Sequence, residues 1–212
     1  MEVIKCSWYH ADVAHHGRDR LAMCSDDSYV YLIGGCEGDS CTNECHRYDP
    51  KTNGWSTLKP MDCERSQAAA VHFNGKLYVF GGYTSNRCLS SCEILTLSTD
   101  QWSTGAPMRE NRRGCGAVVY RDKIFIIGGS NGVTSLTSIE VFDPITNEWL
   151  TSAHAFQGEL NVPRVGVGIA VCADKLYVVG GFDGRNFLKT IEVYDEQSQR
   201  WKLSHTKIDK NT

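Results

Sequence analysis

The sequence has no long apolar run and no long run of charge of one sign. Its longest apolar stretches, such as 123–127 and 175–179, have the length of strands and are far too short to span a bilayer. The formal net charge of −3 over 212 residues favours neither a nucleic acid nor a membrane surface as partner. The first residues lack the apolar core of a signal peptide, and no Asn-x-Ser/Thr sequon occurs, so we expect a cytoplasmic location.

Signals for catalysis are also sparse. The sequence contains no His-Glu-x-x-His motif and no phosphate-binding glycine loop. Two adjacent carboxylates occur at Asp26 and Asp27, but neighbouring side chains on a strand point apart and do not form a catalytic pair. We therefore expect a protein that is not an enzyme, with no catalytic residue, no metal site and no cofactor.

What the sequence does contain is a fourfold repeat built around a Gly-Gly pair. A tryptophan follows the first glycine of each pair by 21 residues, and an arginine precedes it by 16. The glycines and tryptophans are Gly34, Gly35 and Trp55; Gly81, Gly82 and Trp102; Gly128, Gly129 and Trp149; and Gly180, Gly181 and Trp201. The arginines are Arg18, Arg65, Arg112 and Arg164. A period of this length is typical of solenoids and propellers.

One repeat has the pattern of four short strands. In the third copy, small and β-branched residues at 114–120 precede a turn, and the apolar run 123–127 ends at its Gly pair. A loop then leads to 138–142, and a last strand begins at 148–150. Each segment is bounded by turn residues, and none has helical periodicity of useful length. The pattern predicts a four-stranded meander in every copy.

The repeats also predict how the sheets pack together. The first strand of each copy is rich in small side chains, which suit the crowded axis of a radial array. Each Gly pair is expected where the backbone bends or approaches a neighbour closely. Each tryptophan can cover the gap between two sheets. Because one such sheet cannot bury both faces alone, a ring of four-stranded blades is the expected solution.

These motifs resemble the Kelch repeat: Arg, then Tyr/Phe-x-x-Gly-Gly, then Glu-x-Tyr/Phe-Asp, then Trp. The middle part stands at 31–35, 78–82, 125–129 and 177–181, and the Glu-containing part at 140–143 and 192–195. The first copy departs from the pattern with His46 in place of Glu, and the second with Leu95 and Thr96 in place of Tyr-Asp. The resemblance covers about residues 8–206. It is closest to the Kelch region of Kelch-like proteins and implies an all-β fold, a Kelch β-propeller.

The resemblance divides the chain into five segments. Residues 16–62, 63–109, 110–154 and 155–212 are expected to form four blades, the last with a C-terminal tail. Trp8 lies ten residues before Arg18, in register with the later copies, so residues 1–15 are interpreted as the outer strand of a truncated preceding blade. The alternative is that Trp8 completes the last blade. The resemblance to Kelch-like proteins implies a six-bladed propeller, so we expect these blades to be part of such a ring.

Function is expected in the loops at one end of the blades. The loops that follow the Gly pairs and those that precede the inner strands should emerge on the same face, and they differ between copies while the framework does not. The repeated arginines are expected to brace these loops. The candidate partner-binding residues are Arg20, Arg87, Arg113, Asn131, Phe156, Asp183, Arg185 and Phe187. An insertion within 155–162, carrying Phe156 and Leu160, is expected to form one wall of the site beside Arg113 and Phe187.

Three functional hypotheses follow from the resemblance. The first is a protein-interaction module that, in a full-length form with a BTB region, is the substrate receptor of a cullin-based ubiquitin ligase. The second is an actin-binding, cytoskeleton-associated scaffold. The third, a propeller oxidase, needs a converging Tyr/His/Cys copper-ligand set, and no assembled set is seen. The partner is thus expected to be a protein, either a ubiquitination substrate or actin, and the sequence does not identify it.

The ten cysteines allow two interpretations. Cys41 and Cys88 follow the first glycine of their pairs by seven residues, and Cys45 and Cys92 follow it by eleven, a spacing unlike that of zinc sites. In a cytosolic chain they are expected to be reduced thiols. They are either small buried hydrophobic residues or a redox-sensing cluster that neighbouring blades bring together.

Overall fold

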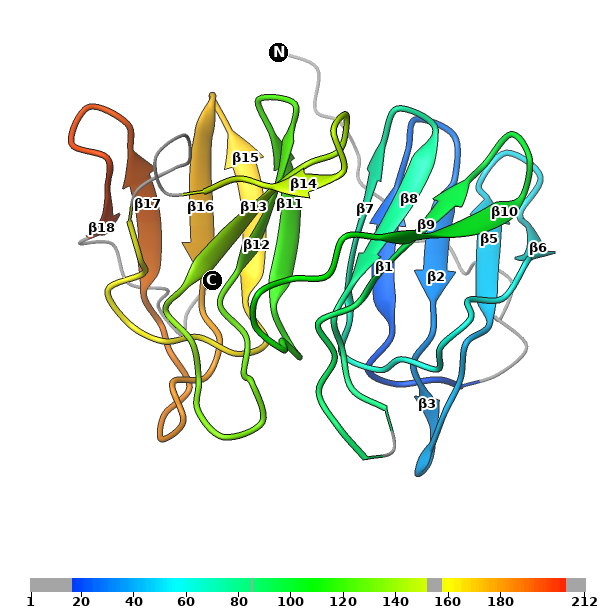
Figure 1. The fold of residues 1–212 in the computed structure, drawn as a ribbon, viewed down its shortest axis with the longest axis horizontal. Coiled ribbons are helices and arrows are strands. Elements are labelled where there is room, and N and C mark those ends of the chain that lie inside the picture. Colours follow the sequence, from blue (N-terminus) through cyan, green and yellow to red (C-terminus); the bar gives the residue numbers. More distant parts are fainter. Residues whose placement is uncertain (1–16, 85, 152–157, 205–212) are drawn as a thin grey trace, which may run out of the picture.

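The described part of the protein consists of β-strands, turns and loops. The computed structural model describes residues 17–84, 86–151 and 158–204, and these contain no helix. Their strands form four separate four-stranded antiparallel sheets and one two-stranded hairpin (Figure 1). No helix in the described ranges has the length and hydropathy needed to cross a membrane.

Each sheet is a meander of four strands in chain order, which we call blades 1 to 4. Blade 1 contains β1 (Ala22–Ser25), β2 (Val30–Ile33), β5 (Cys45–Asp49) and β6 (Gly54–Leu58). Blade 2 contains β7 (Ala69–Phe73), β8 (Lys76–Phe80), β9 (Cys92–Thr96) and β10 (Gln101–Gly105). Blade 3 contains β11 (Gly116–Tyr120), β12 (Lys123–Ile127), β13 (Ile139–Asp143) and β14 (Glu148–Trp149). Blade 4 contains β15 (Gly168–Cys172), β16 (Lys175–Val179), β17 (Ile191–Asp195) and β18 (Arg200–Leu203).

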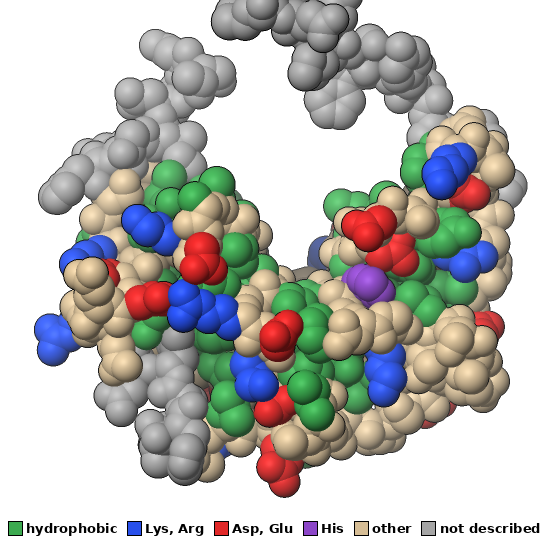
Figure 2. All heavy atoms as spheres, turned by 90° about the horizontal axis from the view of Figure 1, so that it is seen from above, with side chains coloured by type: hydrophobic (Ala, Val, Ile, Leu, Met, Phe, Trp, Pro, Cys, Tyr) green, Lys and Arg blue, Asp and Glu red, His purple; other side chains and the backbone are tan. Residues whose placement is uncertain are grey.

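The blades stand side by side around a common axis. Their inner strands β1, β7, β11 and β15 contact one another in that order. Seen from above, the described atoms form an arc that is open on one side (Figure 2). The predicted all-β fold of Kelch blades is confirmed. The predicted outer strand at 1–15 lies outside the described residues, and closure into a six-bladed ring stays a prediction.

The hydrophobic core lies between blades, because each sheet is apolar on both faces. In β12, Ile124 and Ile126 pack in the cluster shared with blade 2, whereas Phe125 and Ile127 pack in the cluster shared with blade 4. This explains why the strand is a continuous apolar run, a pattern expected of strands buried on both faces. Burial of one such side chain contributes about 1.5–3 kcal/mol, so each blade is stabilised mainly by its neighbours.

The Gly pairs are the points where successive blades touch through their backbones. Gly81 has φ of +59°, and a Cβ there would lie 2.3 Å from the carbonyl oxygen of Arg112 in the next blade. The amide of Gly82 donates a hydrogen bond of 2.7 Å to that same oxygen. The amides of Gly35 and Gly129 make the equivalent bonds to Arg65 and Arg164. Only glycine combines this backbone conformation with so close an approach, as the sequence predicted.

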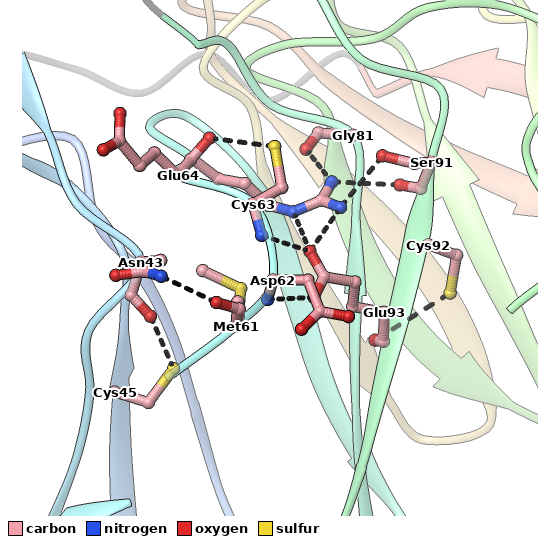
Figure 3. Close-up of polar contacts among 11 residues, drawn as sticks. Asn43, Cys45, Met61, Asp62, Cys63, Glu64, Gly81, Ser91, Cys92 and Glu93 are labelled. Carbon is pink, nitrogen blue, oxygen red and sulfur yellow. Dashed lines mark hydrogen bonds and ion pairs between the residues drawn. The ribbon is translucent and has the colours of Figure 1, made fainter. Parts of the chain in front are cut away.

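The repeated arginines are buried ion-pair partners rather than surface groups. Arg65 is 1% exposed and donates to Oε1 of Glu93 at 3.0 and 2.7 Å, and also to the carbonyl oxygens of Gly81 and Ser91. Glu93 in turn accepts from the backbone N–H groups of Asp62 and Cys63 (Figure 3). The pairs Arg112–Glu140 and Arg164–Glu192 repeat this arrangement.

In the first copy this network is altered, because His46 stands where the other copies have Glu. There Nη2 of Arg18 lies 2.6 Å from Nδ1 of His46, and its Nη1 lies 3.8 Å from a carboxylate oxygen of Glu44. Each of the other three arginines lies in the loop before the inner strand of its blade, and its side chain binds the carbonyl oxygen at the end of the second strand of the same blade. The prediction that the repeated arginines brace loops is therefore confirmed for Arg65, Arg112 and Arg164.

Trp102 and Trp149 join their outer strands to the preceding blade. The indole N–H of Trp149 donates to the carbonyl oxygen of Ala106 at 2.9 Å, and that of Trp102 donates to Lys59 at 2.7 Å. The centre of the Trp149 ring lies 5.0 Å from the centre of the Phe142 ring in its own blade and 5.7 Å from that of Phe80 in blade 2. The predicted covering role of the tryptophans is thus confirmed at these two positions.

We expect Glu140→Ala to lower the free energy of unfolding by about 3 kcal/mol, because the guanidinium of Arg112, which is 0% exposed, loses its buried counter-ion and keeps only the half-exposed Glu110. The matched control is Glu148→Ala, an exposed glutamate of the same blade, which should change stability by less than about 0.5 kcal/mol. Urea unfolding followed by tryptophan fluorescence measures both. Equal midpoints for the two variants would contradict this role of the ion pair.

We expect Trp149→Ala to destabilise the protein by about 3 kcal/mol, since it removes aromatic packing across the boundary between blades 2 and 3. Trp149→Phe keeps much of that packing and loses only the hydrogen bond to Ala106, so about 1 kcal/mol is expected. Val133→Ala, at a side chain 91% exposed, serves as the neutral control. Thermal unfolding would rank the three variants, and a Trp149→Ala protein as stable as the control would refute the packing role.

Candidate functional site

Two sets of loops emerge together at one end of the blades. Isolated antiparallel bridges join the residue before each inner strand to the residue after each Gly pair: Asp19 to Cys36, Ser66 to Tyr83, Arg113 to Ser130 and Val165 to Phe182. The loops after β2, β8, β12 and β16 all run to the lower end of the molecule (Figure 1). We call this surface the loop face, formed by residues 36–41, 83–84, 86–88, 130–135 and 182–187 with the bridged residues 19, 66, 113 and 165. The predicted common face is confirmed.

The loops of blades 3 and 4 are held by their own side chains. Oδ1 of Asn131 accepts hydrogen bonds of 2.9 Å from the backbone N–H groups of Val133 and Thr134. Oδ1 of Asp183 accepts two bonds of 2.7 Å from Arg185 and Asn186, and these bonds hold the pKa of Asp183 below its usual value. Loops fixed in this way lose little conformational entropy on binding. Direct contact of Asn131 and Asp183 with a partner stays a prediction.

Between blades 2 and 3 the loop face contains an open hollow of about 550 Å³. Tyr83, Arg87, Asn111, Asn131 and Val133 are among the residues that line it. Its volume lies within the range of ordinary ligand pockets. The hollow brings two predicted residues together, Arg87 and Asn131, which come from different blades.

A third predicted residue, Arg113, lies beside the hollow. Its guanidinium carbon is 5.1 Å from the centre of the Tyr83 ring, a cation–π contact that holds the side chain over the lining of the hollow. Arg87 of blade 2 and Arg113 of blade 3 therefore place two positive charges beside the hollow. Tyr83 was not among the sequence candidates, although it directly follows the Gly pair of its blade.

The tips of the loops in blades 3 and 4 expose large apolar side chains. Val133 is 91% exposed and Phe187 is 85% exposed, while the Phe187 ring packs 5.2 Å from that of Phe182. A Cβ at Gly184 would lie 3.5 Å from Oγ of Ser135, so the two loops are in contact. Arg185 is exposed in the same loop as Phe187. Exposed aromatic and arginine side chains side by side are typical of interaction surfaces.

The remaining candidates lie apart from this group or outside the described residues. Arg20 belongs to blade 1, where it pairs with Asp19 at 3.1 Å and donates to the carbonyl oxygen of Gly38. Phe156 lies outside the described residues. Of the candidates from the sequence, Arg87, Arg113 and Asn131 thus lie around the hollow, and Asp183, Arg185 and Phe187 lie on the loop of blade 4.

The expectation that Leu160 forms a wall of the site is wrong. Leu160 is 4% exposed and packs in the core between blades 3 and 4, and its amide donates to the carbonyl oxygen of Thr137. It lies four residues before Arg164, as Met61 and Met108 lie four residues before Arg65 and Arg112, and both methionines are buried. Leu160 is thus a repeated core position, and this register was the signal that sequence reasoning missed.

The cysteines do not form the suggested four-thiol cluster. Cys45 and Cys92 are fully buried in different inter-blade clusters, where burial raises the pKa of each thiol to about 12. Their interpretation as small buried hydrophobic residues is confirmed. Cys41 instead lies beside Cys36, with their sulfur atoms 2.8 Å apart.

The loop face carries no recognisable catalytic arrangement in its described residues. Residues 128–132 match the pattern Gly-x-Ser-x-Gly, but Ser130 accepts a hydrogen bond from the amide of Gly132 and leads into a loop. A nucleophile elbow requires a helix after the serine. Within the described ranges, no three His, Cys, Asp or Glu side chains gather as a metal site requires.

Comparison with known proteins agrees with this architecture. The model of the KLHDC2/KLHL20/DRC7 Kelch-repeats domain matches residues 2–103 and 23–212. Human Kelch-like protein 4 is 54% identical over 43 residues, 20% of this chain and 6% of that protein. Human Kelch-like protein 35 is 31% identical over 71 residues, 34% of this chain and 12% of that protein. The matched segments thus span only a small part of these relatives. Because the family model covers nearly the whole sequence, the chain belongs to the Kelch-repeat family.

Proposed function

We propose that the loop face binds a segment of a partner protein and that the full-length protein acts as the substrate receptor of a cullin-based ubiquitin ligase. Kelch repeats form a protein-interaction module, and this chain belongs to that family. The observation that carries the proposal is the pair of exposed apolar tips, Val133 and Phe187, beside arginines on loops with fixed backbones. Large apolar side chains exposed at the loop tips are expected to be covered by a partner.

The chemistry of the face suits a partner segment with both apolar and acidic side chains. Phe187 and Val133 serve as anchors, since aromatic and large apolar groups contribute most to interface energy when water is excluded around them. Arg87, Arg113 and Arg185 supply cations for carboxylates, and a guanidinium can hold a carboxylate through two parallel hydrogen bonds. Arg113 is positioned in advance by Tyr83, which lowers the entropy cost of using it.

Recruitment of a cullin is assigned to a BTB region in the full-length protein, and the Kelch blades supply recognition only. The similarity to human Kelch-like proteins 4 and 35 supports membership of the Kelch-like group, and the resemblance to that group is the ground for this assignment. Actin is the rival partner. We propose the same loop face as its binding surface, so one set of variants tests both hypotheses.

We expect the double substitution Val133→Asp and Phe187→Asp to weaken partner binding at least about a hundredfold, as expected for the loss of two anchors at about 1.4 kcal/mol per tenfold change. The matched control is Ile145→Asp, at a side chain 76% exposed in the turn between β13 and β14, at the opposite end of the blade. Proximity labelling in cells with the full-length protein, followed by affinity measurement with each captured protein, provides the readout.

A ubiquitination substrate should be lost with the double variant and retained with Ile145→Asp. Filamentous actin that co-sediments with the parent and the control, but not with the double variant, would replace the ligase proposal with the cytoskeletal one. Equal binding by all three proteins would show that recognition does not use the loop face.

A further inference from the structure

The hairpin on the loop face of blade 1 holds two cysteines opposite each other. β3 (Cys36–Glu37) pairs with β4 (Ser40–Cys41), and the register places Cys36 directly across from Cys41. The amide of Thr42 donates to the carbonyl oxygen of Gly35, so the cysteines occupy a position without hydrogen bonds between their own backbones. At such positions Cα atoms lie about 4.5 Å apart, a separation that a disulfide can span. The two sulfur atoms are already 2.8 Å apart.

The other blades show that the turn itself does not require cysteine. The same two positions carry Tyr83 and Cys88 in blade 2, Ser130 and Ser135 in blade 3, and Phe182 and Phe187 in blade 4, and each pair forms an antiparallel bridge. Among these four hairpins, only that of blade 1 has cysteine on both sides. The hairpin therefore forms without cysteines, and the Kelch fold does not explain why blade 1 has a pair of them.

The two thiols differ in their access to solvent. Cys36 is 2% exposed, whereas Cys41 is half-buried and its thiol points toward Oγ of Ser66. Burial raises the pKa of Cys41, and its hydrogen bond with Cys36 raises that pKa further, while Ser66 and the guanidinium of Arg20 lower it. Cys41 at rest is therefore mainly a thiol, and its minor thiolate form is the one that reacts. A small oxidant reaches Cys41 first, with Cys36 behind it in position to attack.

We propose that Cys36 and Cys41 form an oxidation site that hydrogen peroxide converts into a disulfide. Cys41 first loses its proton to water, and its thiolate attacks one peroxide oxygen. The O–O bond breaks, Cys41 becomes a sulfenic acid, and the departing hydroxide takes up a proton and leaves as one water. The Cys36 sulfur then attacks the Cys41 sulfur, the S–O bond breaks, and the S–S bond forms as a second water leaves. Two electrons pass from the thiols to the peroxide, and the two thiol protons end in the two waters.

The disulfide would change a contact that reaches the hollow. The reduced Cys41 thiol lies 3.5 Å from Oγ of Ser66 and 3.8 Å from the carbonyl oxygen of Tyr83, and the Tyr83 ring lies beneath Arg113. Oxidation removes the S–H group of Cys41, which donates to Ser66 and to the carbonyl oxygen of Tyr83 in the reduced protein. An effect on partner binding rests on the proposed function, whereas formation of the disulfide does not.

The test is oxidation of the full chain with a small excess of hydrogen peroxide, followed by blocking of free thiols and digestion after glutamate. Cleavage after Glu37 and Glu44 puts Cys36 and Cys41 on separate peptides. We expect the two peptides to appear joined, with the mass of two hydrogens lost, and to separate when a reducing agent is added. This measurement uses the unmodified sequence, so it does not depend on whether a variant folds.

Two substitutions identify the pair. Cys36→Ser should abolish the joined peptides completely and leave Cys41 as a sulfenic acid that a dimedone probe traps. Cys88→Ser, at the position equivalent to Cys41 in blade 2, should leave the amount of joined peptides unchanged. Joined peptides that persist in Cys36→Ser, or Cys41 that remains a free thiol in the parent while the exposed Cys172 is oxidised, would overturn the proposal.

Discussion

In blades 2 to 4, the buried ion pair between an arginine and a glutamate of the same repeat is the interaction on which the architecture depends. Arg112 reaches from the loop before β11 to Glu140 on β13 and to the carbonyl oxygen of Gly128 at the end of β12. Its own carbonyl oxygen accepts the amide of Gly82 from the preceding blade. One residue thus fixes three strands and the boundary between two blades. Breaking such a buried pair is strongly destabilising, because it leaves a buried charge poorly compensated.

This constraint explains why function can vary on the loop face while the framework stays the same. The loops begin immediately after the Gly pairs, whose backbones are fixed by the next blade. Side chains beyond them, such as Val133, Phe187 and the Cys36–Cys41 pair, have no part in that network and are free to differ between copies. The result is a rigid platform with variable tips, which is the arrangement expected of a recognition surface.

Much of the fold could be predicted from the sequence, because the features that specify it are local and repeated. The strands, the Gly pairs and the covering tryptophans each follow from a residue type at a fixed spacing. What could not be predicted depends on pairing across space. The apolar character of Leu160 suggested a surface wall, yet its repeat register with Met108 places it in the core. The Cys36–Cys41 contact arises from the register of a hairpin only six residues long, which periodicity over whole repeats does not reveal.

Native-state hydrogen exchange of the second glycine in the first three pairs tests the central claim most directly. The amides of Gly35, Gly82 and Gly129 lie in loops, but each donates to the arginine carbonyl of the next blade. If the arginine network joins the blades, these amides should exchange only through global unfolding, as slowly as the amides of β12. Exchange at the rate of freely exposed loop amides would show that the blades are not held together at these points and would contradict the account.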